Sequence, residues 1–389
     1  MPSFFVTLRL TSLAALAAFG STAASGENPQ TVAADISVIT PDEGRYYNGW
    51  PTLARQKNGS LIVVWSGGRD AHVCPFGRVE SMSSQDEGKN WSWPRVLFDS
   101  AIDDRDAGVL VTARGTLLVT SFNSLVYNTP RNREKYPQQK DKWDRHERGL
   151  SVANKERAHL AYLLRSEDGG TTWSTAQLIP VSSPHGPLQL DDGRLLYPGV
   201  QRAGADPHDP TATRRIGVWE SKDDGHTWTF LSPLPARPGD NPNDYHEFHG
   251  VQASNGTIVV QIRSHADESN RQMLQTLSTD GGRTWSVPRT LGIFGYPPHL
   301  MRLRDGRLLV SYDHRRAPYG VQARVSTDAG TTWSEPLAIT SNAVKLDQGY
   351  PSTVELGNGQ LLTVWYEIPP GAKKAVLKQA RWSLPALLP

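Results

Sequence analysis

Short apolar runs alternate with turn residues along nearly the whole chain. Six of these runs follow a dipeptide that ends in Gly, and a further short apolar segment precedes each turn. The six turn glycines are Gly59, Gly115, Gly193, Gly256, Gly306 and Gly359. Asn-Gly and Asp-Gly between apolar runs are the strongest short-range signal for a β-hairpin. The pattern therefore predicts six hairpins.

A second repeat, Ser-x-Asp-x-Gly-x-(Thr/Asn)-Trp, occurs five times. Its copies begin at Ser84, Ser166, Ser221, Ser278 and Ser326. In such a turn the Asp carboxylate accepts backbone N–H groups, Gly permits the backbone conformation, and Trp packs the turn onto the sheet. We predict a structural role for all five Asp residues and place none of them in an active site.

Together the repeats define six units of about four strands, which predicts an all-β, six-bladed β-propeller. Residues 25–389 are expected to form this single domain. The sixth unit lacks its own Asp turn, so the early strand at residues 35–39 is predicted to complete it. Residues about 127–157 are rich in Lys, Arg, Asn and Gln and are interpreted as an insertion in the second blade, either a lid or a surface loop.

The first 24 residues have the composition of a secretory signal peptide. Arg9 precedes an apolar run, and small residues follow it up to Ala24, where cleavage is expected. The run is too short to span a bilayer. The sequence therefore predicts an exported protein, periplasmic or secreted.

Charge and cysteine content exclude several function classes. Lys plus Arg number 41 against 39 Asp plus Glu, and no block of like charge occurs, which argues against a nucleic-acid partner. Cys74 is the single cysteine, so a disulfide framework and a cysteine-rich zinc site are excluded. No HExxH or comparable spacing supports a metal site, and no metal or cofactor is expected.

The repeat also predicts which residues surround the central tunnel. The positions nine residues before each hairpin glycine lie where the innermost strands begin, and they are Trp50, Asp106, Pro184, Glu247, Pro297 and Tyr350. His185, His249 and His299 lie one or two positions further on and are expected at the same mouth. The ends of the second strands add Arg69, Asp70, His72, Arg263 and Arg315. Such a ring suits an anionic ligand and acid/base chemistry, although the same groups could simply satisfy one another around a water-filled tunnel.

These residues resemble those of the sialidase (neuraminidase) superfamily, whose Asp-box is similar to the second repeat. The segment Gly349-Tyr350-Pro351 resembles the one that carries the family's Tyr nucleophile. Glu247, followed sixteen residues later by Arg263, resembles the Glu that activates this Tyr and the second carboxylate-binding Arg. Arg315 or Arg316 resembles the third Arg approximately.

Two positions depart from the family pattern. Tyr47-Asn48-Gly49-Trp50-Pro51 stands where the family has its first carboxylate-binding Arg, and no Arg is present. Both Asp70 and His72 are candidates where the family's acid/base Asp is expected. Arg69 is a candidate to replace the absent Arg.

The resemblance implies an exported exo-glycosidase that hydrolyses a terminal acidic sugar, sialic acid or a related one, from glycoconjugates. In this interpretation Tyr350 attacks, Glu247 takes its proton, and His72 or Asp70 protonates the leaving oxygen. Arg69, Arg263 and Arg315 hold the carboxylate, and Asp106, His185, His249 and His299 complete the substrate site. Two alternatives remain open: a uronate-directed lyase or unusual glycosidase, and a non-catalytic carbohydrate-binding propeller.

Overall fold

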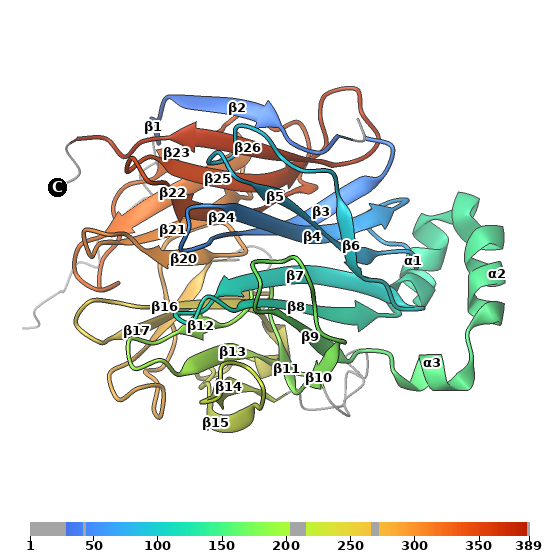
Figure 1. The fold of residues 1–389 in the computed structure, drawn as a ribbon, viewed down its shortest axis with the longest axis horizontal. Helices are drawn as coiled ribbons and strands as arrows, with labels where there is room; N and C mark the ends of the chain where they lie inside the picture. The colour runs from blue at the N-terminus through green and yellow to red at the C-terminus, as the bar shows by residue number, and fades with distance from the viewer. Residues whose placement is uncertain (1–28, 42–43, 203–214, 266–271, 387–389) are drawn as a thin grey trace, which may run out of the picture.

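The computed structural model describes residues 29–41, 44–202, 215–265 and 272–386. Within these ranges the strands form six sheets arranged in a ring (Figure 1), which confirms the six-bladed propeller. The predicted signal peptide, residues 1–24, lies outside the described residues.

Each sheet is one blade and runs from an inner strand to an outer one. Blade one contains β3 (Tyr47–Arg55), β4 (Leu61–Arg69), β5 (Arg78–Ser84) and β6 (Arg95–Phe98). Blade two contains β7 (Asp103–Val111), β8 (Leu117–Ser124), β9 (Ala161–Ser166) and β10 (Gln177–Ile179). Blade three contains β11 (Val181–Ser182), β12 (Leu188–Gln189), β13 (Leu195–Gln201), β14 (Ile216–Ser221) and β15 (Thr229–Pro233).

Blades four to six complete the ring. Blade four contains β16 (Tyr245–Gln252), β17 (Ile258–Ser264), β18 (Leu274–Ser278) and β19 (Arg289–Thr290). Blade five contains β20 (His299–Arg302), β21 (Leu308–His314), β22 (Gly320–Ser326), β23 (Leu337–Ala338) and β1 (Gln30–Thr31). Blade six contains β24 (Gln348–Glu355), β25 (Leu361–Glu367), β26 (Val376–Trp382) and β2 (Ala34–Val38).

The ring closes as the sequence predicts. Strand β2 pairs antiparallel with β26, with Asp35 opposite Arg381. An N-terminal strand therefore completes the blade formed by the C-terminal part of the chain. Strand β1 adds a parallel edge to blade five, a pairing that the repeats do not indicate.

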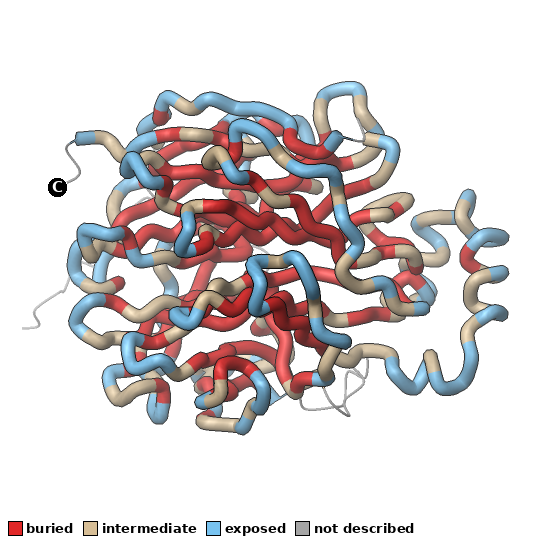
Figure 2. Tube along the Cα trace, viewed as in Figure 1, coloured by how far each residue is buried: buried red, intermediate tan, exposed pale blue. Residues whose placement is uncertain are grey.

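The core lies between neighbouring blades. One cluster joins Leu53 and Trp65 of blade one to Val364 and Tyr366 of blade six. Figure 2 shows that burial follows the strands, whereas the connecting turns are exposed. The six hairpin glycines have φ between 86° and 93°, a left-handed conformation that Gly adopts without a Cβ penalty.

The Asp turns connect the third and fourth strands and also join blades. In the second copy Ser166 Oγ donates to Asp168 Oδ1 (2.8 Å), and the Thr172 N–H donates to the same oxygen (2.9 Å). Hydrogen bonds from Thr172, first that of its side chain, lower the pKa of Asp168 to about 2. The Trp333 indole reaches Gln275 of the preceding blade at 2.9 Å. These bonds give the repeat a structural role.

Residues 127–157 contain three helices, α1 (Pro130–Lys135), α2 (Lys140–Gly149) and α3 (Val152–Glu156). They stand at one end of the ring (Figure 1). Short 3-10 turns, η1 (Val126–Asn128) and η2 (Pro137–Gln139), flank α1, and a third, η3 (Pro242–Asp244), precedes β16. None of the described helices has the length and apolar character needed to cross a membrane.

Candidate functional site

Four innermost strands carry a β-bulge, and each bulge holds a residue with a left-handed backbone. These residues are Trp50 (φ 57°), Asp106 (φ 47°), Glu247 (φ 50°) and Tyr350 (φ 53°). A positive φ is costly for a residue with a Cβ and concentrates at functional sites. All four side chains line one cavity at the end of the ring, at four of the six positions that the hairpin spacing predicts.

The cavity has a volume of about 660 Å³ and an excess of positive charge. Its lining includes the cations Arg105, Lys135, Arg202, Arg263 and Arg315, the carboxylates Asp106, Glu247 and Asp347, the histidines His72 and His246, and the rings of Trp50, Phe122, Tyr136, Tyr350 and Tyr366. Five cations against three carboxylates leave a surplus of two positive charges even when every acid is ionised. The cavity therefore suits an anionic ligand.

Tyr350, Glu247 and Arg263 form a linked set at the base of this cavity. The Tyr350 hydroxyl donates to Glu247 Oε1, and Arg263 Nη1 donates to both carboxylate oxygens of Glu247 (2.6 and 2.7 Å). Burial alone would raise the pKa of Glu247, but the charge and hydrogen bonds of Arg263 outweigh it and lower that pKa. Burial, followed by the charge of Glu247, raises the pKa of Tyr350 well above 10. Tyr350 is therefore a neutral phenol hydrogen-bonded to an ionised base.

His72 packs edge-on against the Trp50 ring, with centroids 5.0 Å apart, and is held there by Asp347. His72 Nδ1 lies 2.8 Å from Asp347 Oδ1, which also accepts from the hydroxyls of Tyr47 (2.7 Å) and Tyr366 (3.2 Å). Burial would raise the pKa of Asp347, but these hydrogen bonds lower it to about 2. The ionised Asp347 requires a proton on Nδ1 of His72, which leaves Nε2 as the nitrogen that can exchange a proton with a ligand.

Two predicted residues do not reach the cavity. Asp70 forms an ion pair with Lys142 of α2 (2.5 Å) and is absent from the lining. Arg69 is fully buried, and its guanidinium bonds to Asp103 and to Ser66 Oγ. Arg69 therefore does not fill the place of the absent Arg from within the cavity, because Asp103 of the next blade binds its guanidinium and the side chain is buried.

Arg105, the residue before Asp106, supplies the cation on that side instead. Asp103 binds both arginines, with Arg69 Nη2 at 2.9 Å and Arg105 Nη1 at 3.2 Å. The two guanidinium carbons lie 4.7 and 4.3 Å from the Trp50 ring centroid. One carboxylate between two guanidinium groups leaves a positive charge beside Trp50, which belongs to the segment that departs from the family pattern.

Arg315 and Arg263 approach the cavity from blades five and four. Arg315 Nε lies 2.5 Å from Asp313 Oδ2, and Arg315 Nη1 donates to the Leu346 carbonyl (2.6 Å). The Tyr296 ring contacts both guanidinium groups, with centroid distances of 4.1 Å to Arg263 and 5.0 Å to Arg315. These contacts fix two cavity arginines in place before any ligand binds.

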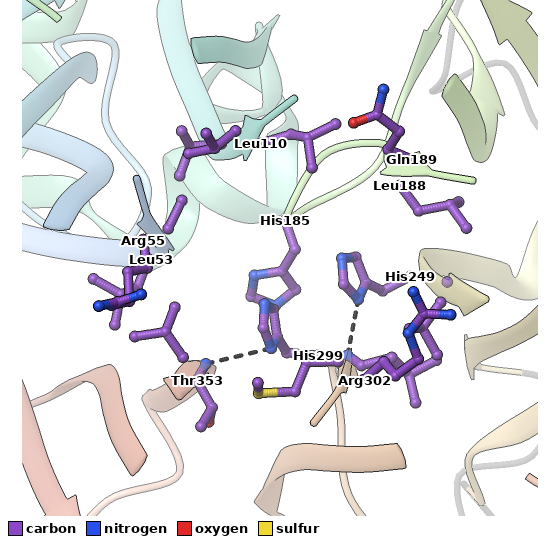
Figure 3. Close-up of a pocket in the computed structure, with 18 of the residues that line it drawn as sticks. Leu53, Arg55, Leu110, His185, Leu188, Gln189, His249, His299, Arg302 and Thr353 are labelled. Carbon is purple, nitrogen blue, oxygen red and sulfur yellow. Dashed lines mark hydrogen bonds between the residues drawn. The ribbon is translucent and has the colours of Figure 1, made fainter. Parts of the chain in front are cut away.

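The three other predicted histidines lie in a second cavity of about 510 Å³, which contains none of the catalytic candidates (Figure 3). His249 Nδ1 accepts from the Leu300 N–H (2.9 Å), and His299 Nδ1 accepts from the Thr353 N–H (3.3 Å). His185, not the predicted Pro184, has the left-handed backbone in blade three (φ 67°). His249 and His299 do not share the mouth of Tyr350 as predicted, because both line this second cavity and bond to neighbouring blades. The His185 ring lines the second cavity too, but its centroid lies only 6.1 Å from that of the Tyr350 ring.

The histidine cluster is not arranged for a metal ion. Neutral rings of His249 and His299 that accept a backbone N–H at Nδ1 carry their proton on Nε2, so this nitrogen offers no lone pair. In the described part of the chain no group of three His, Cys, Asp or Glu side chains has the geometry of a metal site.

The site also contains residues that the sequence did not single out, chiefly Arg105, Arg202, Asp347 and Tyr366. Arg105 is adjacent to a predicted position, and Asp347 lies three residues before Tyr350. Proximity to a register position is the signal by which both could have been found.

Comparison with known proteins assigns this architecture to a class. The sequence model of the BNR repeat-like domain matches residues 149–363, more than half of the chain. A sialidase of Micromonospora viridifaciens is 26% identical over 238 residues, which cover 54% of this chain and 35% of that protein. A xyloglucanase of a Paenibacillus species is 29% identical over 220 residues, 48% of this chain and 19% of that protein. The chain thus spans about a third or less of these curated relatives.

Solved structures show the same fold. A protein of unknown function from Dyadobacter fermentans superposes with a TM-score of 0.72 at 22% identity, covering 90% of this chain and 98% of that one. A Hadza microbial sialidase gives a TM-score of 0.62 at 19% identity, covering 88% and 66%. The molecule is a sialidase-like, six-bladed propeller. The chain belongs to the BNR repeat-like domain family.

Proposed function

We propose that this protein is a retaining glycoside hydrolase that removes a terminal acidic sugar, sialic acid or a close relative, from a glycoconjugate. The hydrogen bond between Tyr350 and Glu247 carries the proposal, because it pairs a phenol with a base inside a cavity that has surplus positive charge. The similarity to sialidases supports the same chemistry.

Charge explains why a phenol suits this substrate. A sugar with a carboxylate on its anomeric carbon would repel an ionised Asp or Glu nucleophile, whereas neutral Tyr350 approaches without repulsion. Arg263 and Arg315 hold the substrate carboxylate, and Arg105 adds a third cation beside the Trp50 ring. The buried Nε of Arg263 has no hydrogen-bond partner among the described residues.

The reaction follows in two steps. Tyr350 Oη attacks the anomeric carbon as its proton passes to Glu247; the glycosidic C–O bond breaks, and His72 Nε2–H protonates the leaving oxygen. Water then attacks the anomeric carbon, the neutral His72 takes a proton from it, and Glu247 returns the proton to the Tyr350 phenolate. The net anomeric configuration is retained.

Replacement of Tyr350 by Phe tests the proposal. The variant keeps the ring but removes the nucleophile, and hydrolysis of an aryl sialoside should fall at least about 1,000-fold. Tyr319→Phe, outside the cavity, is the matched control and should hydrolyse at the parent rate. Full activity of Tyr350→Phe, or inversion at the anomeric carbon in an NMR time course, would contradict the assignment of Tyr350 as the nucleophile of a retaining hydrolase.

One observation favours a second candidate, a uronate-directed lyase. Burial lowers the pKa of His72 below 6.5, although the hydrogen bond and charge of Asp347 act to raise it, so the imidazole is largely neutral at pH 7. A neutral His–Asp pair is a base, and elimination requires a base to remove the proton beside the uronate carboxylate. Elimination would yield an unsaturated uronate with a new ultraviolet absorbance and a rate that rises with pH. Hydrolysis through the imidazolium instead gives a rate that rises as the pH falls.

Export stays a proposal as well. It rests on the pattern of residues 1–24, and the N-terminal mass of the protein recovered from the native cell envelope or medium tests it.

A further inference from the structure

The helical insertion carries a charge opposite to that of the rest of the chain. Residues 127–157 contain nine Lys or Arg and five Asp or Glu, a net charge of +4, whereas the whole chain carries +2. The remaining residues are therefore net negative. The helices of this segment stand at one end of the ring (Figure 1), and two of its residues line the cavity.

The insertion is anchored rather than loosely attached. Trp143 and Tyr127 are fully buried and form an apolar cluster with Val73 and Cys74 of the blade-one loop. Lys142 adds an ion pair to Asp70. Burial of two large aromatic rings fixes the insertion as a wall of the cavity.

Two side chains of this wall line the cavity itself. They are Lys135, at the end of α1, and Tyr136, which follows it. Lys135 Nζ lies 5.4 Å from the Tyr136 ring centroid, so a cation and a flat apolar face are presented together. That combination suits a sugar ring that bears a carboxylate.

The insertion carries further cations on its surface. Arg131, Lys135, Arg145 and Arg148 are exposed, and none has a carboxylate of the described residues within ion-pair distance. The insertion's Asp144 and Glu147 are already paired, with Arg133 and Lys155 respectively. The exposed Glu134, Asp141 and Glu156 also have no ion-pair partner among the described residues, so the wall keeps only the surplus of unpaired cations over these three carboxylates.

We propose that the insertion is a subsite for an acidic oligosaccharide chain, in which Tyr136 and Lys135 bind the sugar that follows the reacting one. The inference rests on the proposed function and narrows its substrate class to glycans with consecutive acidic sugars. Arg145 and Arg148 add long-range attraction for the rest of the chain.

The test compares two substrates that present the same reacting sugar: an aryl sialoside and an α2,8-linked sialic acid tetramer. In the Lys135→Gln variant, kcat/KM for the tetramer should fall about tenfold more than kcat/KM for the aryl sialoside, since only the tetramer places a carboxylate against Lys135. Arg145→Gln with Arg148→Gln should lower the tetramer rate mainly at low salt. Lys89→Gln, which removes an exposed charge from an Asp turn, should alter neither.

Equal loss on both substrates, or none, would overturn the subsite. If the parent protein hydrolyses neither compound, the proposed function fails, and calorimetric titration of the same tetramer still decides the inference. Binding that weakens in Lys135→Gln but not in Lys89→Gln supports the subsite; equal affinities for all three proteins, or no binding, contradict it.

Discussion

Asp347 Oδ1 lies 2.8 Å from Nδ1 of His72, although 275 residues separate the two in the sequence. Closure of the ring explains the contact, because blades one and six are neighbours and the segment before β24 faces the end of β4. The carboxylate fixes the tautomer of the imidazole and would stabilise its charged form during proton transfer.

Asp347→Asn should therefore lower kcat about 100-fold with a smaller effect on KM, because the amide no longer stabilises the imidazolium. The pKa of His72 should fall further without the carboxylate, so the limb of the pH–rate profile that reports His72 should move to lower pH. Kinetics between pH 4 and 8 measure both effects. Tyr47→Phe removes only one donor to Asp347 and should change kcat much less. An unshifted profile in Asp347→Asn would show that His72 does not carry the proton.

Arg69 and Arg105 share Asp103 but should respond differently to substitution. Arg69→Met breaks a fully buried ion pair, which should reduce the free energy of unfolding by about 3 kcal/mol. Arg105→Met removes a cavity cation and should raise KM for an acidic substrate about tenfold with a smaller loss of stability. Urea unfolding and steady-state kinetics on both variants separate the roles. A larger KM effect in the Arg69 variant would reverse them.

The repeat spacing was sufficient to place the left-handed residues of four blades. It works because each inner strand runs a fixed distance from its hairpin to its bulge, so Glu247 and Tyr350 could be placed at the same mouth from the spacing, whereas their pairing was implied by the resemblance to sialidases. In blade three the residue with the left-handed backbone is His185, one position after Pro184, which the spacing indicates. Its inner strand is divided between β11 and β12, and the spacing rule assumes a continuous strand.

Partners across the ring could not be predicted in the same way. The sequence places Arg69 at the end of β4 but does not show that Asp103 of the next blade buries it. The contact of Asp347 with His72 likewise depends on how blades one and six meet. Such contacts are set by packing between blades, which a repeat pattern within blades does not encode.

His249 should make stability depend on pH. Burial lowers its pKa to about 3, and Nδ1 accepts the Leu300 N–H. Below pH 6.5 the unfolded chain binds a proton at this residue that the folded protein does not, so the folded state loses about 1.4 kcal/mol per pH unit from this group as the pH falls toward 3. His249→Gln keeps an acceptor but cannot titrate.

Denaturant unfolding of the parent and of His249→Gln at pH 7, 6, 5 and 4 measures this contribution. The free energy of unfolding of the parent relative to that of the variant should decrease from pH 7 to pH 4. Its limiting slope should correspond to one bound proton, about 1.4 kcal/mol per pH unit. Titrating groups that do not contact His249 affect both proteins alike and cancel in the difference, whereas the pKa values of the neighbouring His185 and His299 are themselves lowered by burial and by the charge of His249. A constant difference between the two would mean that His249 titrates in the folded protein as it does in the unfolded chain.

Asp106 should set the pH dependence of ligand affinity. Burial raises the pKa of Asp106 to about 6. The positive charge of Arg105 opposes this rise, and the negative charge of Glu247 adds to it. Between pH 7 and 5 the carboxyl gains a proton, one negative charge leaves the cavity, and an acidic ligand should bind about fivefold more tightly, which corresponds to roughly 1 kcal/mol of relieved repulsion.

Asn tolerates the left-handed backbone at this position, so Asp106→Asn removes the charge without a new strain. Titration of sialic acid by calorimetry should give a parent affinity that approaches that of the variant as the pH falls below 6, with His72 contributing equally to both. If the two proteins keep a constant ratio of affinities from pH 7 to 5, Asp106 does not titrate in this range.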